Sequence, residues 1–313
     1  MGYLTNGSVK NCSNHASVIG IKEDNGGIVG QGSLDTLLEN CVNLGAVTGS
    51  DSSTGGVIGY CKGTLIKCEN SGEVSGTGNS GGIAGCLLEG GSISECTNAS
   101  DVSGTGTAVG GVVGQSDTDI SDCVNKGLTV SSTNDYVGGI VGFGRSVSKC
   151  INKADVTTTG SAAGGIAGSS DGNVIGCRNS GNVRGDQQIG GTVGAKDGGR
   201  IESSINSGAI TGTYFTGGIS GRLNGSAAVS GCSSSGAVSG TQNVGGIVGG
   251  SANYTSSPIN SCKNTGDVTG TENNIGGVIG LSNGTVTYCE NKGIVSGTGE
   301  KVGGVVGENW GTV

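Results

Sequence analysis

Short apolar segments recur along the chain in a fixed order, separated by glycine, asparagine and serine. The most regular segment is a tag of two glycines, two small and mainly apolar residues, and a third glycine. The first glycine of the tag is Gly26, Gly55, Gly81, Gly110, Gly138, Gly164, Gly190, Gly217, Gly245, Gly276 and Gly303. Successive tags lie 29, 26, 29, 28, 26, 26, 27, 28, 31 and 27 residues apart. This period, about 28 residues, lies in the range that marks solenoid repeats.

Each period contains two further apolar positions, placed at constant distances from a recurring cysteine position. An aliphatic residue comes three residues before the cysteine position: Val9, Leu38, Leu65, Ile93, Ile120, Val147, Val174, Ile201, Val229, Ile259 and Val286. The residue six positions after the cysteine is Val18, Val47, Val74, Val102, Thr129, Val156, Val183, Ile210, Val238, Val268 or Val295. With the tag, every period therefore has three short apolar segments.

These segments predict strands, because they are too short for helices, rich in β-branched residues and bounded by turn formers. Three short strands per coil of about 28 residues form a triangular turn, and stacked turns pair each strand with its equivalents at about 4.8 Å per layer. The predicted fold is all-β: a parallel β-solenoid (β-helix) of about eleven coils. We expect a right-handed coil, because parallel crossovers favour that hand. Residues 1–313 form a single array, expected to be a fragment of a larger polypeptide that begins and ends partway through a repeat.

The recurring cysteines predict an inward-facing stack. The cysteine position holds Cys12, Cys41, Cys68, Cys96, Cys123, Cys150, Cys177, Cys232, Cys262 and Cys289, and Ser204 replaces it once. Free cysteine is often buried and behaves as a small apolar side chain. A serine at the same position fits a tight interior site and does not fit a required disulfide partner.

Three other roles for the cysteines are considered. Disulfides between adjacent layers would need converging Cβ atoms, whereas parallel neighbours run side by side. A metal site would need clustered ligands such as CxxC, which the sequence lacks. A catalytic thiol needs a neighbouring base, and His15 is the only histidine. Cys61 and Cys86 lie outside the repeat phase, so we expect them to be the more reactive or the paired thiols.

An asparagine follows the cysteine position by two residues and predicts a ladder of stacked amides. The asparagines are Asn14, Asn43, Asn70, Asn98, Asn125, Asn152, Asn179, Asn206, Asn264 and Asn291, and Ser234 takes the place once. Asparagine tolerates turn conformations, hydrogen-bonds nearby backbone, and can bond its own equivalents along a stack. The row therefore looks structural, and a ligand-binding role is the alternative.

Composition narrows the class of protein. The chain has 70 glycines, which alone would favour a disordered segment, but a third of the residues are hydrophobic and held in phase. A net charge of −8 argues against nucleic acid as a partner. No apolar run approaches the roughly 20 residues that span a bilayer, so no membrane insertion is expected in this segment. No motif for a cofactor or a metal emerges.

The tag GGIVG, followed after a spacer by LLENCVNLGAVTG, resembles the GLUG motif of bacterial cell-surface and secreted proteins. The resemblance extends over the whole chain, unit after unit. It implies an extracellular β-solenoid region at the bacterial surface, of a kind found in adhesins and alongside IgA-cleaving peptidases. It brings no catalytic residue with it, and the regular cysteines depart from the motif's commoner residues at that position.

The leading hypothesis for function is a non-catalytic structural or adhesive repeat region, a rigid stalk or binding surface whose partner is a host or cell-surface protein or glycan. The first alternative is a β-helix enzyme acting on polysaccharides, although Asp117, Asp119 and Asp122 are lone acids without cationic residues at matching phases. An insertion in the longest period makes residues 250–259 the first candidate for a recognition loop.

The second alternative is ice binding by a flat face built from Ser/Thr-Gly-Thr triplets. The threonines of this candidate outer face are Thr77, Thr105, Thr213, Thr241, Thr271 and Thr298. Strand alternation places their hydroxyls on one outer face. Threonine is also a common solvent-facing strand residue, and Arg184 and Asp186 interrupt the array.

Overall fold

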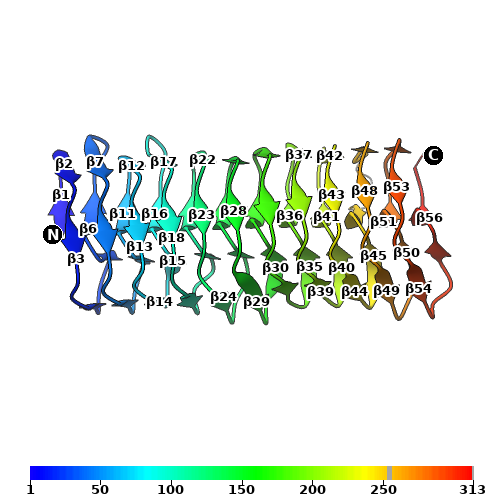
Figure 1. The fold of residues 1–313 in the computed structure, drawn as a ribbon, viewed down its shortest axis with the longest axis horizontal. Coiled ribbons are helices and arrows are strands. Elements are labelled where there is room, and N and C mark those ends of the chain that lie inside the picture. The colour runs from blue at the N-terminus through cyan, green and yellow to red at the C-terminus, as the bar shows by residue number, and fades with distance from the viewer. Residues whose placement is uncertain (252–255, 312–313) are drawn as a thin grey trace.

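The computed structural model describes residues 1–251 and 256–311, which form a straight stack of coils (Figure 1). These residues contain strands, turns and bends and no helix. All strands of the described residues pair in parallel and belong to five sheets that run along the rod, one with 12 strands and four with 11. The fold is thus the predicted all-β parallel β-solenoid, with about 27 residues per coil.

We name the five sheets by the part of the repeat that builds them. The tag-entry sheet ends at the first tag glycine: β5 (Asn25–Gly26), β10 (Ser53–Gly55), β15 (Asn79–Gly81), β20 (Val109–Gly110), β25 (Val137–Gly138), β30 (Ser161–Gly164), β35 (Gln187–Gly190), β40 (Tyr214–Gly217), β45 (Gln242–Gly245), β50 (Ile275–Gly276) and β55 (Val302–Gly303). The tag-exit sheet follows the tag: β1 (Tyr3–Leu4), β6 (Val29–Gly32), β11 (Ile58–Cys61), β16 (Ala84–Leu87), β21 (Val113–Ser116), β26 (Val141–Gly144), β31 (Ala167–Ser170), β36 (Val193–Lys196), β41 (Ser220–Leu223), β46 (Val248–Ser251), β51 (Ile279–Ser282) and β56 (Val306–Asn309).

The other three sheets come from the cysteine half of the repeat. The aliphatic sheet contains β2 (Gly7–Lys10), β7 (Thr36–Glu39), β12 (Thr64–Ile66), β17 (Ser92–Ser94), β22 (Ile120–Ser121), β27 (Val147–Ser148), β32 (Val174–Ile175), β37 (Arg200–Glu202), β42 (Ala228–Ser230), β47 (Ile259–Asn260) and β52 (Val286–Thr287). The asparagine sheet contains β3 (Ser13–Asn14), β8 (Val42–Asn43), β13 (Glu69–Asn70), β18 (Thr97–Asn98), β23 (Val124–Asn125), β28 (Ile151–Asn152), β33 (Arg178–Asn179), β38 (Ile205–Asn206), β43 (Ser233–Ser234), β48 (Lys263–Asn264) and β53 (Glu290–Asn291). The hydroxyl sheet contains β4 (Val18–Gly20), β9 (Val47–Gly49), β14 (Val74–Gly76), β19 (Val102–Gly104), β24 (Thr129–Ser132), β29 (Asp155–Thr158), β34 (Val183–Arg184), β39 (Ile210–Thr211), β44 (Val238–Gly240), β49 (Val268–Gly270) and β54 (Val295–Gly297).

Five strands per coil correct the expectation of three. The tag bends at its second glycine, so it supplies the end of one strand and the start of another, as between β10 and β11. A second extra break lies before the cysteine position, where the backbone has a positive φ of 51–65° in every coil. That conformation turns the chain out of an extended path. The residues at this break are Asn11, Asn40, Lys67, Glu95, Asp122, Lys149, Gly176, Ser203, Gly231, Ser261 and Tyr288.

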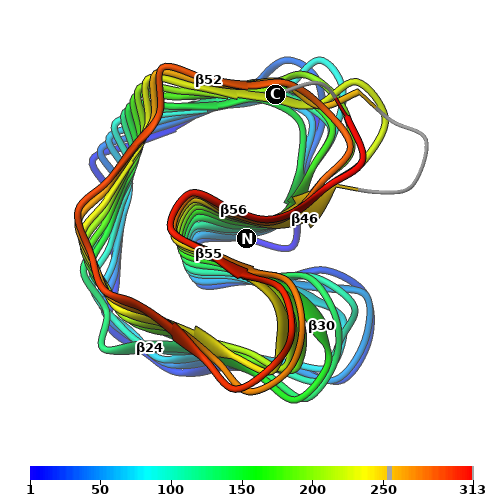
Figure 2. The same ribbon diagram turned by 90° about the vertical axis from the view of Figure 1, so that its right-hand side faces the viewer.

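The cross-section is C-shaped rather than triangular (Figure 2). The tag turn between β55 and β56 projects into the middle of the coil, and the open side lies between β30 and β46. The chain runs counter-clockwise in this view from β52 past β24 to β55 while it advances toward the viewer, which is a right-handed coil.

The inward tag turn divides the interior into two cores. The larger core contains the aliphatic residues of the tag-exit and aliphatic sheets together with the cysteines. The smaller core packs the apolar positions of the hydroxyl sheet, such as Val74 and Val102, against the residue before the tag, such as Val109. Both cores are continuous along the rod because equivalent residues are paired in register.

One sequence assignment is wrong by a single residue. Val102 pairs with Val130, and Val130 is buried, whereas Thr129 is exposed. An extra residue between the asparagine and the strand shifts the position in this coil. Because strand side chains alternate between faces, the shift decides which residue enters the core.

Candidate binding surfaces

The structure places the recurring thiols in one interior column. Eight of the ten are buried, all except Cys12, which is exposed, and Cys289, which is half-buried. The column forms part of the larger core. Burial raises the pKa of Cys177 to about 11, so this thiol stays protonated at neutral pH. Buried protonated thiols are poor nucleophiles and poor metal ligands.

Cys61 and Cys86 lie in the wall of the tag-exit sheet and are also free and buried. Loss of hydration on burial raises the pKa of Cys61 to about 11 and that of Cys86 to about 12. The expectation that these two are the reactive or paired thiols is therefore wrong. Cys61 is in register with the buried Leu87, whereas Cys86 is in register with Tyr60 and Gln115 on the other face of the sheet.

The asparagines form a hydrogen-bonded ladder through the middle of the coils. From Asn14 to Asn206, each Nδ2 donates to Oδ1 of the next asparagine at 2.8–3.0 Å. The same amide also bonds its own strand: Asn70 donates to the carbonyl of Gly72 and accepts from the Gly72 amide. The amide is thereby saturated within the backbone and the ladder, which leaves it no capacity for a ligand.

The ladder closes the space between the two cores by packing on the tag. A Cβ placed on Gly56 would lie 2.1 Å from the carbonyl oxygen of Gly82 and 2.3 Å from Cγ of Asn70. The second tag glycine thus lets the backbone reach the amide column. The ladder is interrupted at Ser234, whose buried hydroxyl has no hydrogen-bond partner among the described residues, and it resumes between Asn264 and Asn291.

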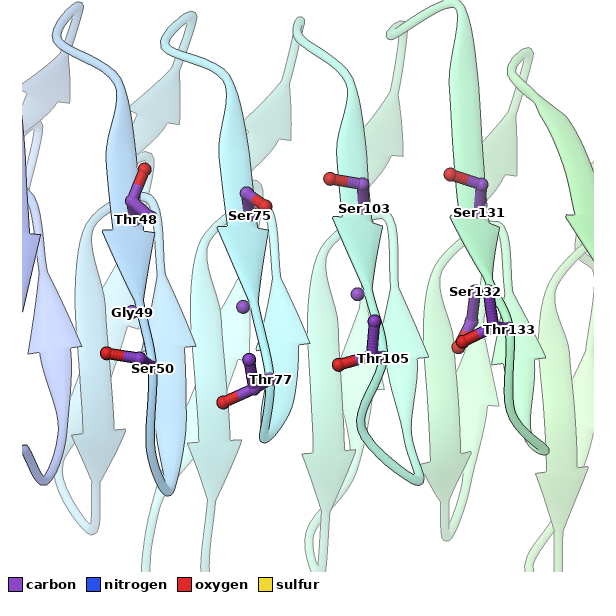
Figure 3. A pocket seen from close by; sticks show the side chains of 12 residues that line it. Thr48, Gly49, Ser50, Ser75, Thr77, Ser103, Thr105, Ser131, Ser132 and Thr133 are labelled. Atoms are coloured by element: carbon purple, nitrogen blue, oxygen red, sulfur yellow. The ribbon is translucent and has the colours of Figure 1, made fainter. Parts of the chain in front are cut away.

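The hydroxyl sheet presents two parallel rows of serine and threonine to the outside (Figure 3). One row contains Thr48, Ser75, Ser103 and Ser131, and the second contains Ser50, Thr77, Thr105 and Thr133, with a shallow hollow of about 400 Å³ over them. Of the six threonines predicted for the outer face, five are exposed and Thr241 is half-buried.

The residue types in the two rows change along the rod. In the first coil the same positions are Ile19 and Ile21, each 77% exposed. Farther along, Arg184 stands between Thr157 and Thr211 in the first row. The glycine between the rows points inward: a Cβ on Gly270 would meet Cδ1 of Ile275 at 2.0 Å. The absence of a side chain at this glycine leaves room for the apolar side chains of the smaller core.

A further row of side chains, missed in the sequence, lines the open side of the coil. It is made of pairs seven residues apart, one member before each tag and one after it. We call them the mouth pairs: 24/31, 53/60, 79/86, 108/115, 136/143, 162/169, 188/195, 215/222, 243/250, 274/281 and 301/308. The signal was available, because the tag has constant length and the pair spacing is therefore constant.

Contacts across the tag show that the two members of a mouth pair face each other. The rings of Tyr136 and Phe143 meet edge-to-face, with centroids 5.7 Å apart. The guanidinium of Arg222 lies 5.1 Å from the ring centroid of Phe215. Between neighbouring coils, the Asn79 amide donates to Oε1 of Gln115 at 2.9 Å.

The acidic residues and metal ligands considered in the sequence analysis do not come together in one site. Asp119 and Asp122 are exposed and Asp117 is half-buried at the corner around β22. No group of three His, Cys, Asp or Glu side chains within the described residues is arranged to hold a metal ion. Of the candidate recognition loop, residues 252–255 lie outside the described residues.

The fold and these surfaces define a right-handed parallel β-solenoid repeat region. A family model described as "The GLUG motif" matches residues 105–131, which span about one coil from the end of β19 to β24. The match supports a GLUG-motif repeat region. No curated protein and no solved structure matches the chain. Among the described residues, no helix is long and apolar enough to cross a membrane.

Proposed function

We propose that this chain is a non-catalytic repeat region of a bacterial surface protein, a rigid rod whose outer faces bind a host or cell-surface protein or glycan. The observation that carries the proposal is the unbroken pairing of all five strand classes along the rod. Each coil is joined to the next by five strands and, over most of the length, by the asparagine ladder. Bending such a stack would break many hydrogen bonds at once.

The exposed chemistry supports a binding role in addition to the mechanical one. The backbone of the repeat is nearly constant, whereas the outward and mouth positions vary from coil to coil. The match to the GLUG motif supports the placement on the bacterial surface. Short coils with a constant core and variable exposed positions are a common design for extended binding surfaces.

The rod can be tested by small-angle X-ray scattering of the purified chain. We expect a profile with the constant cross-section and length of the stack in Figure 1, unchanged between low and high salt. A profile of a flexible chain, with dimensions that change with salt, would contradict the proposal.

The surface and adhesive roles need separate measurements. Antibodies against the chain should label intact bacteria that express the full-length protein, and absence of labelling would argue against surface display. The purified chain should bind cells or arrayed glycans. Surface labelling without any binding would support the stalk role and contradict the adhesive role.

A further inference from the structure

The mouth pairs vary where the rest of the repeat is constant. Between one coil and the next, the tag keeps its glycines, and the aliphatic, cysteine and asparagine positions keep their residue types. The mouth positions instead hold pairs as different as Tyr136 with Phe143, Gln188 with Ala195, and Lys301 with Glu308. A fixed scaffold that displays varied side chains in a line is the arrangement of a recognition groove.

Part of this row is hollowed at two consecutive mouth pairs in which three of the four side chains are small. The pairs at 162/169 and 188/195 place the buried Ala162 and Ala195 in the wall. The resulting hollow has a volume of about 320 Å³, the lower end of the range for small-ligand sites. It extends over two to three coils, about 10–14 Å along the rod. Tyr136 lines one end.

The polar lining of the hollow is held in place by hydrogen bonds. Asp197 accepts from the Ser169 hydroxyl at 2.9 Å and from the Asn224 amide at 2.7 Å. Asp135 accepts from the backbone N–H of Ser161 at 2.7 Å. Each carboxylate keeps further acceptor capacity, since two oxygens offer about four lone-pair positions.

One polar group in the lining has no partner. The half-buried side-chain amide of Gln188 makes no hydrogen bond with the described residues. It offers two donors and an acceptor in the same lining as the two carboxylates. The hollow therefore combines one aromatic side chain, two carboxylates held by hydrogen bonds and a free amide.

We propose that this mouth hollow binds a neutral hexose unit of an oligosaccharide. A pyranose has an apolar C–H face that packs on an aromatic ring and a rim of hydroxyls that donate to carboxylates and amides. The two carboxylates disfavour acidic sugars and phosphates, because like charges repel. The width of two to three layers fits one or two sugar units. The inference rests on the adhesive part of the proposed function and assigns it a site.

The test uses residues 1–313 with three hexasaccharide probes, cellohexaose, maltohexaose and an acidic galacturonate hexamer, followed by saturation-transfer NMR and titration calorimetry. We expect at least one neutral hexamer to bind and the acidic hexamer not to bind. Tyr136→Ala should weaken the neutral hexamer by about tenfold, since a packed ring contributes on the order of 1 kcal/mol. Asp197→Asn should weaken it similarly.

Tyr288→Ala is the matched control. Tyr288 is 88% exposed outside the mouth row, and its φ of 52° is close to the 51° of Tyr136, so alanine at either position keeps the same left-handed backbone conformation. Affinity within twofold of wild type in this control, with loss in Tyr136→Ala, would support the site. No neutral hexamer bound, stronger binding of the acidic hexamer, or equal effects of both tyrosine variants would overturn it. If the Tyr136→Ala variant still bound cells, this result would contradict the mouth hollow as the binding site and would still support the adhesive proposal.

Discussion

At the scale of single residues, the stability of the interior depends on buried polar side chains whose hydrogen-bonding groups are paired within the stack. The ladder amide of Asn125 accepts from Asn98 at 3.0 Å and donates to Asn152 at 3.0 Å. The interior asparagines Asn98, Asn125 and Asn152 are fully buried. Buried amides of this kind stabilise only when every member is satisfied, because an unpaired buried group costs about 1–3 kcal/mol.

The break at Ser234 gives a test in which stability should rise. Ser234→Asn restores a side chain that can bond Asn206 and Asn264, so we expect the free energy of unfolding to increase by about 1–2 kcal/mol. Slower backbone hydrogen exchange in the neighbouring coils would register the change. Ser233→Asn is the control, because Ser233 is the adjacent residue of β43 and lies half-buried on the opposite side. Equal effects of the two variants would count against the ladder.

Lys196 gives a test of pH dependence. Its fully buried ammonium group donates to the carbonyls of Ser170 and Gly172, and loss of hydration lowers its pKa from 10.5 to about 8. Between pH 8 and 10.5 the unfolded chain binds the proton that the folded chain has lost, so stability rises with pH in this window. Below pH 8 both states are protonated and the dependence disappears.

The reference variant for this test is Lys196→Leu, which copies Leu223, the paired residue of the next coil. Relative to the variant, wild type should gain up to about 1.4 kcal/mol of unfolding free energy per pH unit between pH 8 and 10. Urea unfolding followed by circular dichroism at pH 7, 8, 9 and 10 measures the difference. A difference independent of pH would show that Lys196 is not desolvated in the native state.

At the scale of strands and turns, the tag turn determines the cross-section. The first tag glycine has no room for a side chain because a carbonyl of its own tag lies against it, as Ile58 does beside Gly55. The second has none because the backbone of the next coil lies against it, as Gly82 does beside Gly56. The turn therefore enters the coil interior, contacts the asparagine ladder and creates two cores in place of one.

Substitution of tag glycines should depend on the coil. Gly56→Ala places a Cβ 2.1 Å from a neighbouring carbonyl oxygen, so we expect a loss of about 3 kcal/mol or more, or failure to fold. Gly304→Ala, at the same tag position, has no atom within 4 Å of the added Cβ and should be tolerated. Thermal melting of the two variants measures the contrast. Similar melting temperatures would contradict the inward tag turn.

Comparison of sequence and structure separates what periodicity can reveal from what it cannot. The period, the parallel stacking and the layer count follow from recurring apolar positions, and the right hand follows from the general preference of parallel crossovers. The number of strands did not follow, because the breaks at the second tag glycine and before the cysteine are backbone conformations shared by residues as different as Lys67 and Asp122. The mouth hollow was missed because its residues share a position and not a residue type.

At the scale of the whole molecule, the interior columns run along the rod, and the asparagine ladder is broken at Ser234. The aliphatic, cysteine and asparagine columns are each formed by residues about one coil apart. No coil buries its apolar side alone, and neighbours supply the missing contacts. A binding surface on such a rod is long and straight, and its chemistry can change from coil to coil without altering the fold.

Mapping of alkylated cysteines by mass spectrometry tests this stack most directly. In native protein treated briefly with iodoacetamide, Cys12 should be modified quickly, Cys289 more slowly, and the ten buried thiols only after unfolding. Native modification of Cys123, Cys150 and Cys177 at the rate of Cys12 would contradict the interior column, and with it the stacked solenoid.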